Sequence, residues 1–250
     1  MSRDDAGAPA VEEGTPGTPV RAARQPDRGS VGVLRQVSDI LLGGGQVLVT
    51  LLASPLLRLR YNRWGADAEE VGAPMPGDDL VPAPRLGYTR AVTIGAPVDA
   101  VWPWLAQMGQ GRGGLYSYDG LENLLGCDLH SADDVLPGHQ DVRPGDLIRL
   151  GPEGYPCFRV HRVTPPTTLV LVSTGPEATY PRPRAVAADP VVTWQWTLRP
   201  VDAGRRTRLV VRQRLAFPRS QRVLWRLVEP IGFVMERRML HGIKRRAERR

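Results

Sequence analysis

The chain has 250 residues, of which 42% are hydrophobic, and its formal net charge is +7. This length and apolar content are sufficient for a globular domain with a sizeable buried core. The two cysteines, Cys127 and Cys157, are too few for a disulfide framework, so a small disulfide-stapled domain is excluded and both are predicted to be free thiols.

The positive charge is concentrated at the C-terminal end. From Arg205 onward there are fifteen basic and three acidic residues, a net charge of +12, which leaves −5 for the preceding residues. Lys244 is the only lysine in the sequence. Because an arginine bias follows from GC-rich coding as readily as from anion binding, the charge is not taken as a sign of nucleic acid, and no nucleic-acid partner is expected.

The N-terminal quarter of the sequence has two different compositions. Residues 1–30 are rich in alanine, proline, glycine and charge, and this predicts a disordered tail. Residues 31–60 predict an apolar helix, since residues 40–57 carry no charge and approach the length that spans a bilayer. Glycines at 43–45 and Pro55 interrupt this run.

Two placements of this apolar helix are compatible with the sequence: association with a membrane, or packing on the domain or a partner. Arginines flank it on both sides, so charge does not orient it and a surface-lying helix fits as well as a spanning one. A signal peptide is not expected because the apolar run follows a long polar leader. The predicted location is the cytoplasm, with the inner face of the membrane as the membrane-associated alternative.

Prolines and glycines without clear periodicity predict an irregular connector over residues 61–85, with one helical turn at 66–71. A folded domain is expected over residues 86–250. Its first predicted strand is 88–94, and Pro97 begins a predicted helix over 98–108.

The glycine-rich segment that follows matches the GxGxxG pattern of dinucleotide-binding loops at Gly109, Gly111 and Gly114. Such a loop must follow a strand and begin a helix, whereas these glycines follow the end of a helix. Nucleotide binding is therefore not predicted, and the glycines are expected to allow a tight turn. A second short helix is predicted over 117–125.

Strands dominate the next part of the chain, at 146–150, 157–163, 168–173, 191–199 and 206–217. The intervening residues 175–189 lack a pattern and predict a loop able to cover an opening. Residues 220–250 place apolar side chains at steps of three and four, which predicts a long amphipathic helix. Pro230 is expected to kink or divide it.

Alternation sorts the side chains of the last two strands by face. Trp194 and Trp196 share an apolar face with Leu209 and Val211, and Gln213 lies on the same side. Core packing is the favoured interpretation of this aromatic wall, although large inward aromatics on a curved sheet also line ligand cavities. The opposite face carries arginines that we expect to be solvated: Arg206, Arg208, Arg212 and Arg214.

The order of these elements, from a strand and two short helices to antiparallel strands and a long final helix, matches the helix-grip arrangement. Residues 90–247, about two-thirds of the chain, resemble the START-like (SRPBCC) superfamily of polyketide cyclase/dehydrase-like proteins, lipid-transfer domains and ligand carriers. The resemblance rests on APVDAVW at residues 96–102, on residues 104–130, and on Thr193-Trp194 with Thr207-Arg208-Leu209. QMGQ at 107–110, YSY at 116–118 and LEN at 121–123 are similar to a largely uncharacterised actinobacterial subgroup.

The resemblance implies an α+β helix-grip fold, in which a curved antiparallel sheet wraps around the long C-terminal helix, with two short helices after the first strand. It also implies a cavity between sheet and helix that binds a small hydrophobic ligand of lipid, polyketide or isoprenoid type. The candidate ligand-binding residues are Gln107, Gln110, Arg112, Tyr116, Tyr118, Glu122, Trp194, Trp196 and Gln213. For the polar residues among them, a hydrogen-bonded loop lock is an equally weighted alternative.

Two further functions remain open on the sequence. A cyclase- or dehydratase-like enzyme would need an acid/base pair in the cavity, and the candidates are Glu122 and His130, with Tyr116 or Tyr118 polarising a carbonyl. An interaction module recruited to an anionic membrane surface is the other alternative. Cys127 and His130 provide only two closely spaced metal ligands, so no metal and no cofactor are predicted, and the oligomeric state is left open.

Overall fold

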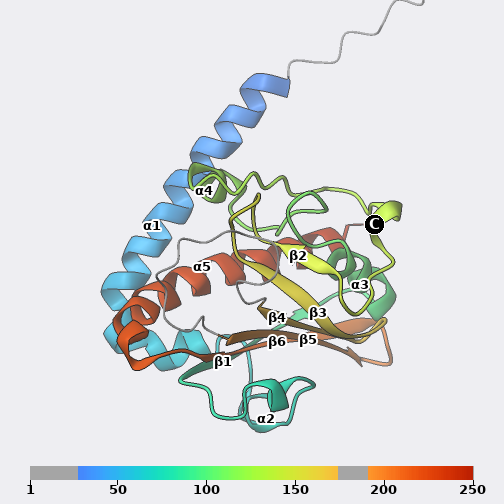
Figure 1. Cartoon of the computed structure of the whole chain (residues 1–250). Coiled ribbons are helices and arrows are strands. Elements are labelled where there is room, and N and C mark those ends of the chain that lie inside the picture. Colours follow the sequence, from blue (N-terminus) through green and yellow to red (C-terminus); the bar gives the residue numbers. More distant parts are fainter. Residues whose placement is uncertain (1–27, 174–190, 250) are drawn as a thin grey trace, which may run out of the picture.

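The computed structural model describes residues 28–173 and 191–249 of an α+β protein (Figure 1). The disorder predicted for residues 1–30 lies almost wholly outside the described residues, and so does the loop predicted at 175–189. The helices are α1 (Arg28–Asn62), α2 (Ala68–Gly72), α3 (Val98–Ala106), α4 (Asp119–Leu124) and α5 (Arg222–Ala247), with short 3₁₀ turns at Asp78–Leu80, Pro137–His139 and Arg219–Gln221. The strands are β1 (Leu86–Ile94), β2 (Leu147–Arg149), β3 (Cys157–Thr164), β4 (Thr168–Ser173), β5 (Val191–Val201) and β6 (Arg206–Ala216).

The six strands form one antiparallel sheet in the order β1-β6-β5-β4-β3-β2, and α5 runs across its concave face (Figure 1). This is a helix-grip fold, as predicted, with the two short helices α3 and α4 following the first strand. The strand register places three side chains in one row across the sheet. Tyr88 on β1 lies opposite Gln213 on β6, and Gln213 lies opposite Trp194 on β5. Because side chains alternate along strands, this row points toward α5.

The core lies between the inner face of the sheet and α5 with α3. Trp196, Leu209 and Val211 from the sheet are fully buried, as are Leu240 and Ile243 from α5. Each fully buried side chain of this size stabilises the fold by about 1.5–3 kcal/mol. The apolar faces predicted from strand alternation and helical periodicity are the faces that meet here.

Helix α5 is continuous through Pro230, so the predicted division of this helix is wrong. Proline removes one backbone hydrogen bond and crowds the preceding turn, but α5 contacts α1, α3 and β1 along its length. Helices in proteins owe most of their stability to such tertiary contacts, which outweigh the loss of one bond. Pro230 itself is buried.

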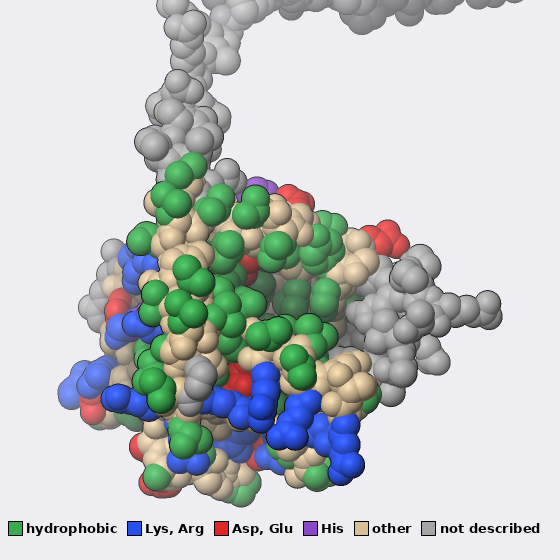
Figure 2. Space-filling view, turned by 90° about the vertical axis from the view of Figure 1, so that its left-hand side faces the viewer, with side chains coloured by type: hydrophobic (Ala, Val, Ile, Leu, Met, Phe, Trp, Pro, Cys, Tyr) green, Lys and Arg blue, Asp and Glu red, His purple; other side chains and the backbone are tan. Residues whose placement is uncertain are grey.

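Helix α1 lies along α5 and α4 at one side of the molecule (Figure 1). Its segment Val37–Ser54 is the one stretch of the described residues that is long and apolar enough, by length and composition, to cross a membrane. Only 11% of that segment is buried within the protein. Figure 2 shows apolar side chains gathered on this side of the molecule, with lysine and arginine side chains below them.

The outer face of the sheet is covered by the connector between α1 and β1, which corrects the expectation of a solvated arginine face. Arg208 and Arg199 donate to the Glu70 carboxylate of α2, with Arg208 Nε–Oε1 at 2.8 Å and Arg199 Nη2–Oε1 at 2.7 Å. Arg212 is buried and pairs with Asp78 of the connector at 2.7 Å. Arg214 donates to the carbonyl of Val81. Arg206, at the first residue of β6, is exposed as expected and pairs with Asp202 in the neighbouring turn.

Candidate functional site

A cavity of about 550 Å³ lies between the inner face of the sheet, α4 and α5. One face of α5 forms its roof, because the lining residues of that helix recur at steps of three and four from Trp225 to Met239. The row of Tyr88, Gln213 and Trp194 lies in the sheet wall. The remaining lining residues are mainly apolar: Leu86, Leu115, Glu122, Cys127, Leu129, Leu150, Pro156, Cys157, Phe158, Ser173, Val192 and Leu215.

The cavity reaches the surface between α4, the start of β3 and the N-terminal half of α5. Most of its lining residues are buried, but Val228 on α5 is 37% exposed and Pro156, just before β3, is exposed. Trp225 on α5 and Cys127 after α4 are half-buried. Within the described residues, these side chains mark the mouth of the cavity.

The sheet wall and the roof meet at a buried carboxylate, Glu236 of α5. It accepts hydrogen bonds from Arg90 Nη1 at 2.6 Å, Trp194 Nε1 at 3.0 Å and Gln213 Nε2 at 3.2 Å. Arg90 is fully buried, and its guanidinium lies 3.9 Å from the centroid of the Tyr88 ring. A buried charge needs such partners, so this network holds the polar wall residues in defined orientations. Burial beside Glu236 also raises the pKa of Tyr88, which keeps its hydroxyl protonated.

A second carboxyl, Glu122 of α4, lines the cavity in a different electrostatic state. Burial, with additional repulsion from Asp119 and Asp39, raises the pKa of Glu122 to about 8. Its side chain is therefore mostly protonated at neutral pH. Among the described residues, Glu122 Oε2 has no hydrogen-bond partner. A protonated carboxyl in the cavity wall is a hydrogen-bond donor.

A third carboxyl, Glu229 of α5, connects the cavity to α1. It is buried, lines the cavity and accepts hydrogen bonds from Arg58 Nε at 3.0 Å and from the Asn62 amide. The bond to Glu229 raises the pKa of Arg58. The side chain that holds the C-terminal end of α1 is thus part of the cavity wall.

Three of the nine ligand-binding candidates line the cavity: Glu122, Trp194 and Gln213. Gln107 does not, since it is fully buried and bonds the loop ahead of the 3₁₀ turn, with Nε2 3.1 Å from Asp134 O and Oε1 2.8 Å from Leu136 N. Arg112 likewise donates to the carbonyls of Ala106 and His139. These two residues form the loop lock that was the alternative interpretation.

The other four candidates also lie outside the cavity wall. Tyr116 donates to Trp104 O at 3.0 Å in the core, and Tyr118 donates to Gln46 of α1 at 2.9 Å. Gln110 bonds Asp128 at the surface, and Trp196 is fully buried in the core. The hydrogen bonds of Tyr116, Tyr118 and Gln110 join separate segments of the chain without a ligand. Trp196 Nε1, in contrast, is buried and has no hydrogen-bond partner among the described residues.

The predicted acid/base pair is not assembled in the cavity. The His130 side chain is 76% exposed and pairs with the exposed Asp128 at 3.1 Å, whereas Glu122 is buried. Tyr116, the third catalytic candidate, points into the core. Of the three, only Glu122 can contact a molecule in the cavity.

Tyr88, Glu229 and Glu236 line the cavity but were not singled out from the sequence. The two glutamates carried a usable signal, because seven-residue spacing puts both on the apolar face of the C-terminal helix, where a carboxylate needs a partner. Tyr88 carried only the general signal of an inward position on the first strand.

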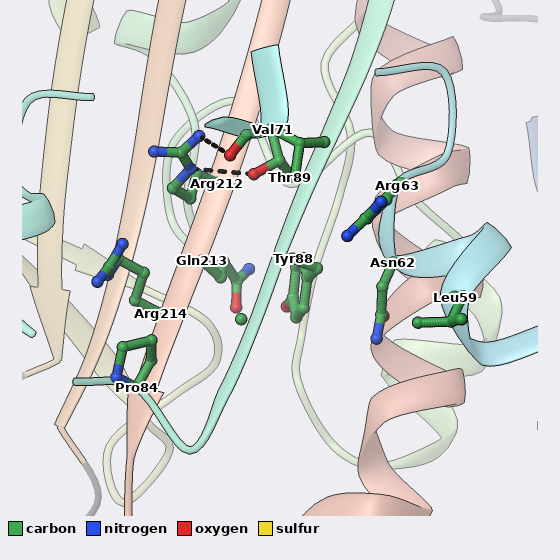
Figure 3. Close-up of a pocket in the computed structure, with 11 residues that line it drawn as sticks. Leu59, Asn62, Arg63, Val71, Pro84, Tyr88, Thr89, Arg212, Gln213 and Arg214 are labelled. Carbon is green, nitrogen blue, oxygen red and sulfur yellow. Dashed lines mark hydrogen bonds between the residues drawn. The ribbon is translucent and has the colours of Figure 1, made fainter. Parts of the chain in front are cut away.

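A smaller hollow of about 260 Å³ lies on the other side of Tyr88 and Gln213, beside the edge strand β1 (Figure 3). Figure 3 shows Arg212 at one side of it, donating to Thr89 Oγ1 and to Val71 O. Since Arg212 already donates to the connector, it is not available to a ligand in this hollow, and the main cavity is the better candidate site. Within residues 28–173 and 191–249, no group of three His, Cys, Asp or Glu side chains could hold a metal ion.

Comparison with known proteins gives similarities at the level of structure alone. No family model matches the chain, and no curated protein matches it. Solved structures similar to it include a protein from Arthrobacter aurescens (15% identity, 66% of this chain and 87% of that chain, TM-score 0.38). Another is CalU16 from Micromonospora echinospora, with 15% identity over 65% of this chain and 83% of that chain and a TM-score of 0.31. A third is Ms6760 from Mycobacterium smegmatis, with 18% identity over 62% of this chain and 89% of that chain and a TM-score of 0.36. With TM-scores below 0.5, none of these similarities assigns a family or a function to this chain.

Proposed function

We propose that this protein binds a small, mostly apolar and uncharged molecule in the cavity between the sheet and α5. The observation that carries the proposal is the cavity itself: about 550 Å³, lined mainly by apolar side chains with a few convergent polar groups. Ligand sites in proteins commonly have this size and this composition. The lipid, polyketide and isoprenoid classes implied by the sequence resemblance are compatible with it.

The polar groups of the wall favour a neutral ligand with a hydrogen-bond acceptor. No arginine, lysine or histidine of the described residues lines the cavity, so an anionic ligand would find no counter-charge in its wall. Glu229 and Glu236 are already paired with Arg58 and Arg90. The protonated Glu122 and the protonated Tyr88 hydroxyl are then donors for a carbonyl or hydroxyl oxygen of the ligand.

Gly232 offers a direct test, because it lies in the middle of the cavity face of α5 and a Cβ there would meet nothing within 4 Å. Gly232→Leu should place its side chain in the cavity and weaken binding of the neutral fluorophore Nile red roughly tenfold or more. Gly232→Ala is the matched control. Both substitutions should raise helix stability by about 0.5–1 kcal/mol, so reduced binding cannot come from unfolding.

Equal binding by the Gly232→Leu and Gly232→Ala proteins would contradict the cavity as the ligand site. Mass spectrometry of organic extracts from both purified proteins extends the test to bound cellular molecules. A compound retained by the alanine variant and lost from the leucine variant would identify the ligand class. If the compound that only the alanine variant retains is anionic, the preference for neutral ligands is contradicted.

Acid catalysis by Glu122 is the second candidate function, favoured by its protonated state and its free Oε2. In a dehydration, the Glu122 proton would leave with a substrate hydroxyl as water, and the resulting carboxylate would take the proton from the carbon beside a carbonyl. Glu122→Gln keeps a hydrogen-bond donor but cannot transfer a proton. Loss of turnover with retained binding would support catalysis, whereas unchanged conversion of the bound compound would exclude it.

A further inference from the structure

We propose that α1 and the N-terminal half of α5 form a docking surface for an anionic lipid bilayer, next to the cavity mouth. This docking surface consists of the exposed apolar residues Leu41, Leu48, Leu52, Leu56 and Leu59 on α1 and Val223, Leu224 and Leu227 on α5. Its existence is independent of the cavity's ligand.

The first observation is that α1 has its polar side inward and its apolar side outward. The five leucines recur at steps that keep one helical face, and they are between 59% and 88% exposed. The side facing the domain is held by polar contacts, such as Tyr118 to Gln46 and Arg58 to Glu229. A helix whose only role is to pack on a soluble domain buries its leucines. Here the leucines are presented to whatever lies outside the protein.

The second observation is that the apolar surface continues onto α5 at the cavity mouth. Val223, Leu224 and Leu227 are between 56% and 71% exposed, and the next residue, Val228, lines the cavity. Leu124 and Leu125, on the opposite side of the mouth at the end of α4, are 67% and 70% exposed. Exposed apolar area of this extent marks an interaction surface.

The third observation is charge, which selects the occupant. On α1 from Val37 onward, on the 3₁₀ turn Arg219–Gln221 and on the first seven residues of α5, every exposed charged side chain described is an arginine. These are Arg60, Arg219, Arg222 and Arg226. The acidic residue of α1, Asp39, is buried and pairs with Arg238 of α5. Leucines flanked by arginines complement the acyl chains and the anionic headgroups of a bilayer.

Two other occupants fit the observations less well. A second copy of this chain, paired through the same surface, would bring two arginine-rimmed patches together, which is electrostatically unfavourable. A membrane-spanning α1 would have to leave its polar contacts with Tyr118, Glu229 and Arg238. We therefore place α1 in the plane of the interface, with its leucine face toward the acyl chains.

The test uses the full chain and two kinds of vesicle, phosphatidylcholine alone and phosphatidylcholine with about 30% phosphatidylglycerol. The wild-type protein should cosediment with the anionic vesicles, and salt should weaken this binding. Leu48→Gln with Leu52→Gln should weaken binding at least about thirtyfold, because two apolar side chains lose their burial. Arg222→Gln with Arg226→Gln should weaken it roughly tenfold or more.

The control substitutions are Val135→Gln and Arg205→Gln, which change an exposed apolar and an exposed basic residue outside the docking surface. Both control proteins should bind vesicles as the wild type does. Nile red binding without vesicles should be unchanged in the docking variants, and Gly232→Leu should leave vesicle binding intact. Failure of docking is therefore distinguishable from failure of the proposed cavity function.

Several results would overturn the proposal. One is binding of anionic vesicles by the docking variants at the level of the controls, and another is equal binding of both vesicle types by the wild type. A third is a dimer in sedimentation velocity that Leu48→Gln with Leu52→Gln dissociates, together with a wild type that does not bind vesicles. The docking surface would then be a contact between copies of this chain. Binding that resists both high salt and alkaline extraction would indicate a spanning helix.

Discussion

Glu122 is the residue whose chemistry most depends on its place in the fold. An exposed glutamate is ionised at neutral pH, but burial in the cavity wall near Asp119 and Asp39 raises the pKa of this carboxyl to about 8. A protonated carboxyl beside an apolar space is a hydrogen-bond donor that a ligand acceptor can use. It also makes the stability of the protein depend on pH.

We predict that Glu122→Gln gains stability over the wild type as the pH rises. Because the folded pKa lies above the unfolded value, the unfolded chain releases its proton first, and Glu122 destabilises the folded protein increasingly between the two pKa values. The variant lacks this effect, so the difference in unfolding free energy should grow by roughly 3–5 kcal/mol from about pH 4.5 to about pH 8. Urea unfolding across this range measures it, with the exposed Glu153→Gln as control. A difference that stays constant with pH would contradict the protonated state.

At the scale of elements, ion pairs attach the connector between α1 and β1 to the outer face of the sheet. Its helix α2 begins with a capping box of Asp67 and Glu70, and Glu70 then reaches Arg199 and Arg208 on the outer face of the sheet. The hydrogen bond from Arg208 lowers the pKa of Glu70. One buried carboxylate thus takes part in the N-terminal cap of α2 and attaches this helix to β5 and β6.

Glu70→Gln should therefore lower the unfolding free energy by about 1–2 kcal/mol at neutral pH, because the guanidinium groups of Arg199 and Arg208 lose their counter-charge, and solvent screens part of this loss since both side chains are partly exposed. The depressed pKa means that this contribution is present above the unfolded pKa of a glutamate and disappears as the pH falls through the folded value. Urea unfolding at neutral and acidic pH measures both effects. Glu69→Gln, on the exposed side of the same helix, is the control, and an equal loss there would contradict the role of Glu70.

At the scale of the whole molecule, the cavity and α1 share a side chain. Glu229 lines the cavity and holds Arg58 and Asn62 at the end of α1, so the wall of the proposed ligand site and the attachment of the proposed docking helix are mechanically linked. Movement of α1 on a membrane would reach the cavity through this contact.

Glu229→Gln should loosen α1 while the sheet stays folded. We expect a loss of about 1–2 kcal/mol, modest because Arg58 is partly exposed, and faster hydrogen exchange confined to residues 52–62 and the start of α5. Hydrogen exchange followed by mass spectrometry measures this. Glu248→Gln, at the far end of α5, should not affect α1. Faster exchange throughout the sheet would contradict a local attachment.

Much of the fold was predictable from the sequence by itself. Alternation along 191–199 and 206–217 determined which side chains face inward, and steps of three and four determined the face of the last helix that meets them. Trp194 and Gln213 were found in the cavity wall for this reason. These features are local, because backbone geometry sets the period of a strand or helix, and that period can be recognised in the order of apolar residues.

Only the tertiary structure decided what each polar side chain does. For Gln107 and Arg112 the sequence left ligand contact and a loop lock open, because their partners Asp134 and His139 lie 27 residues away in the chain, and residue order does not reveal that proximity. Arg208 and Arg212 of β6 meet a connector more than a hundred residues earlier in the sequence, at Glu70 and Asp78, and so are not solvated. Hydrogen bonds and ion pairs form with whatever long-range packing brings opposite, so a polar residue's role is settled by the fold and not by its neighbours in sequence.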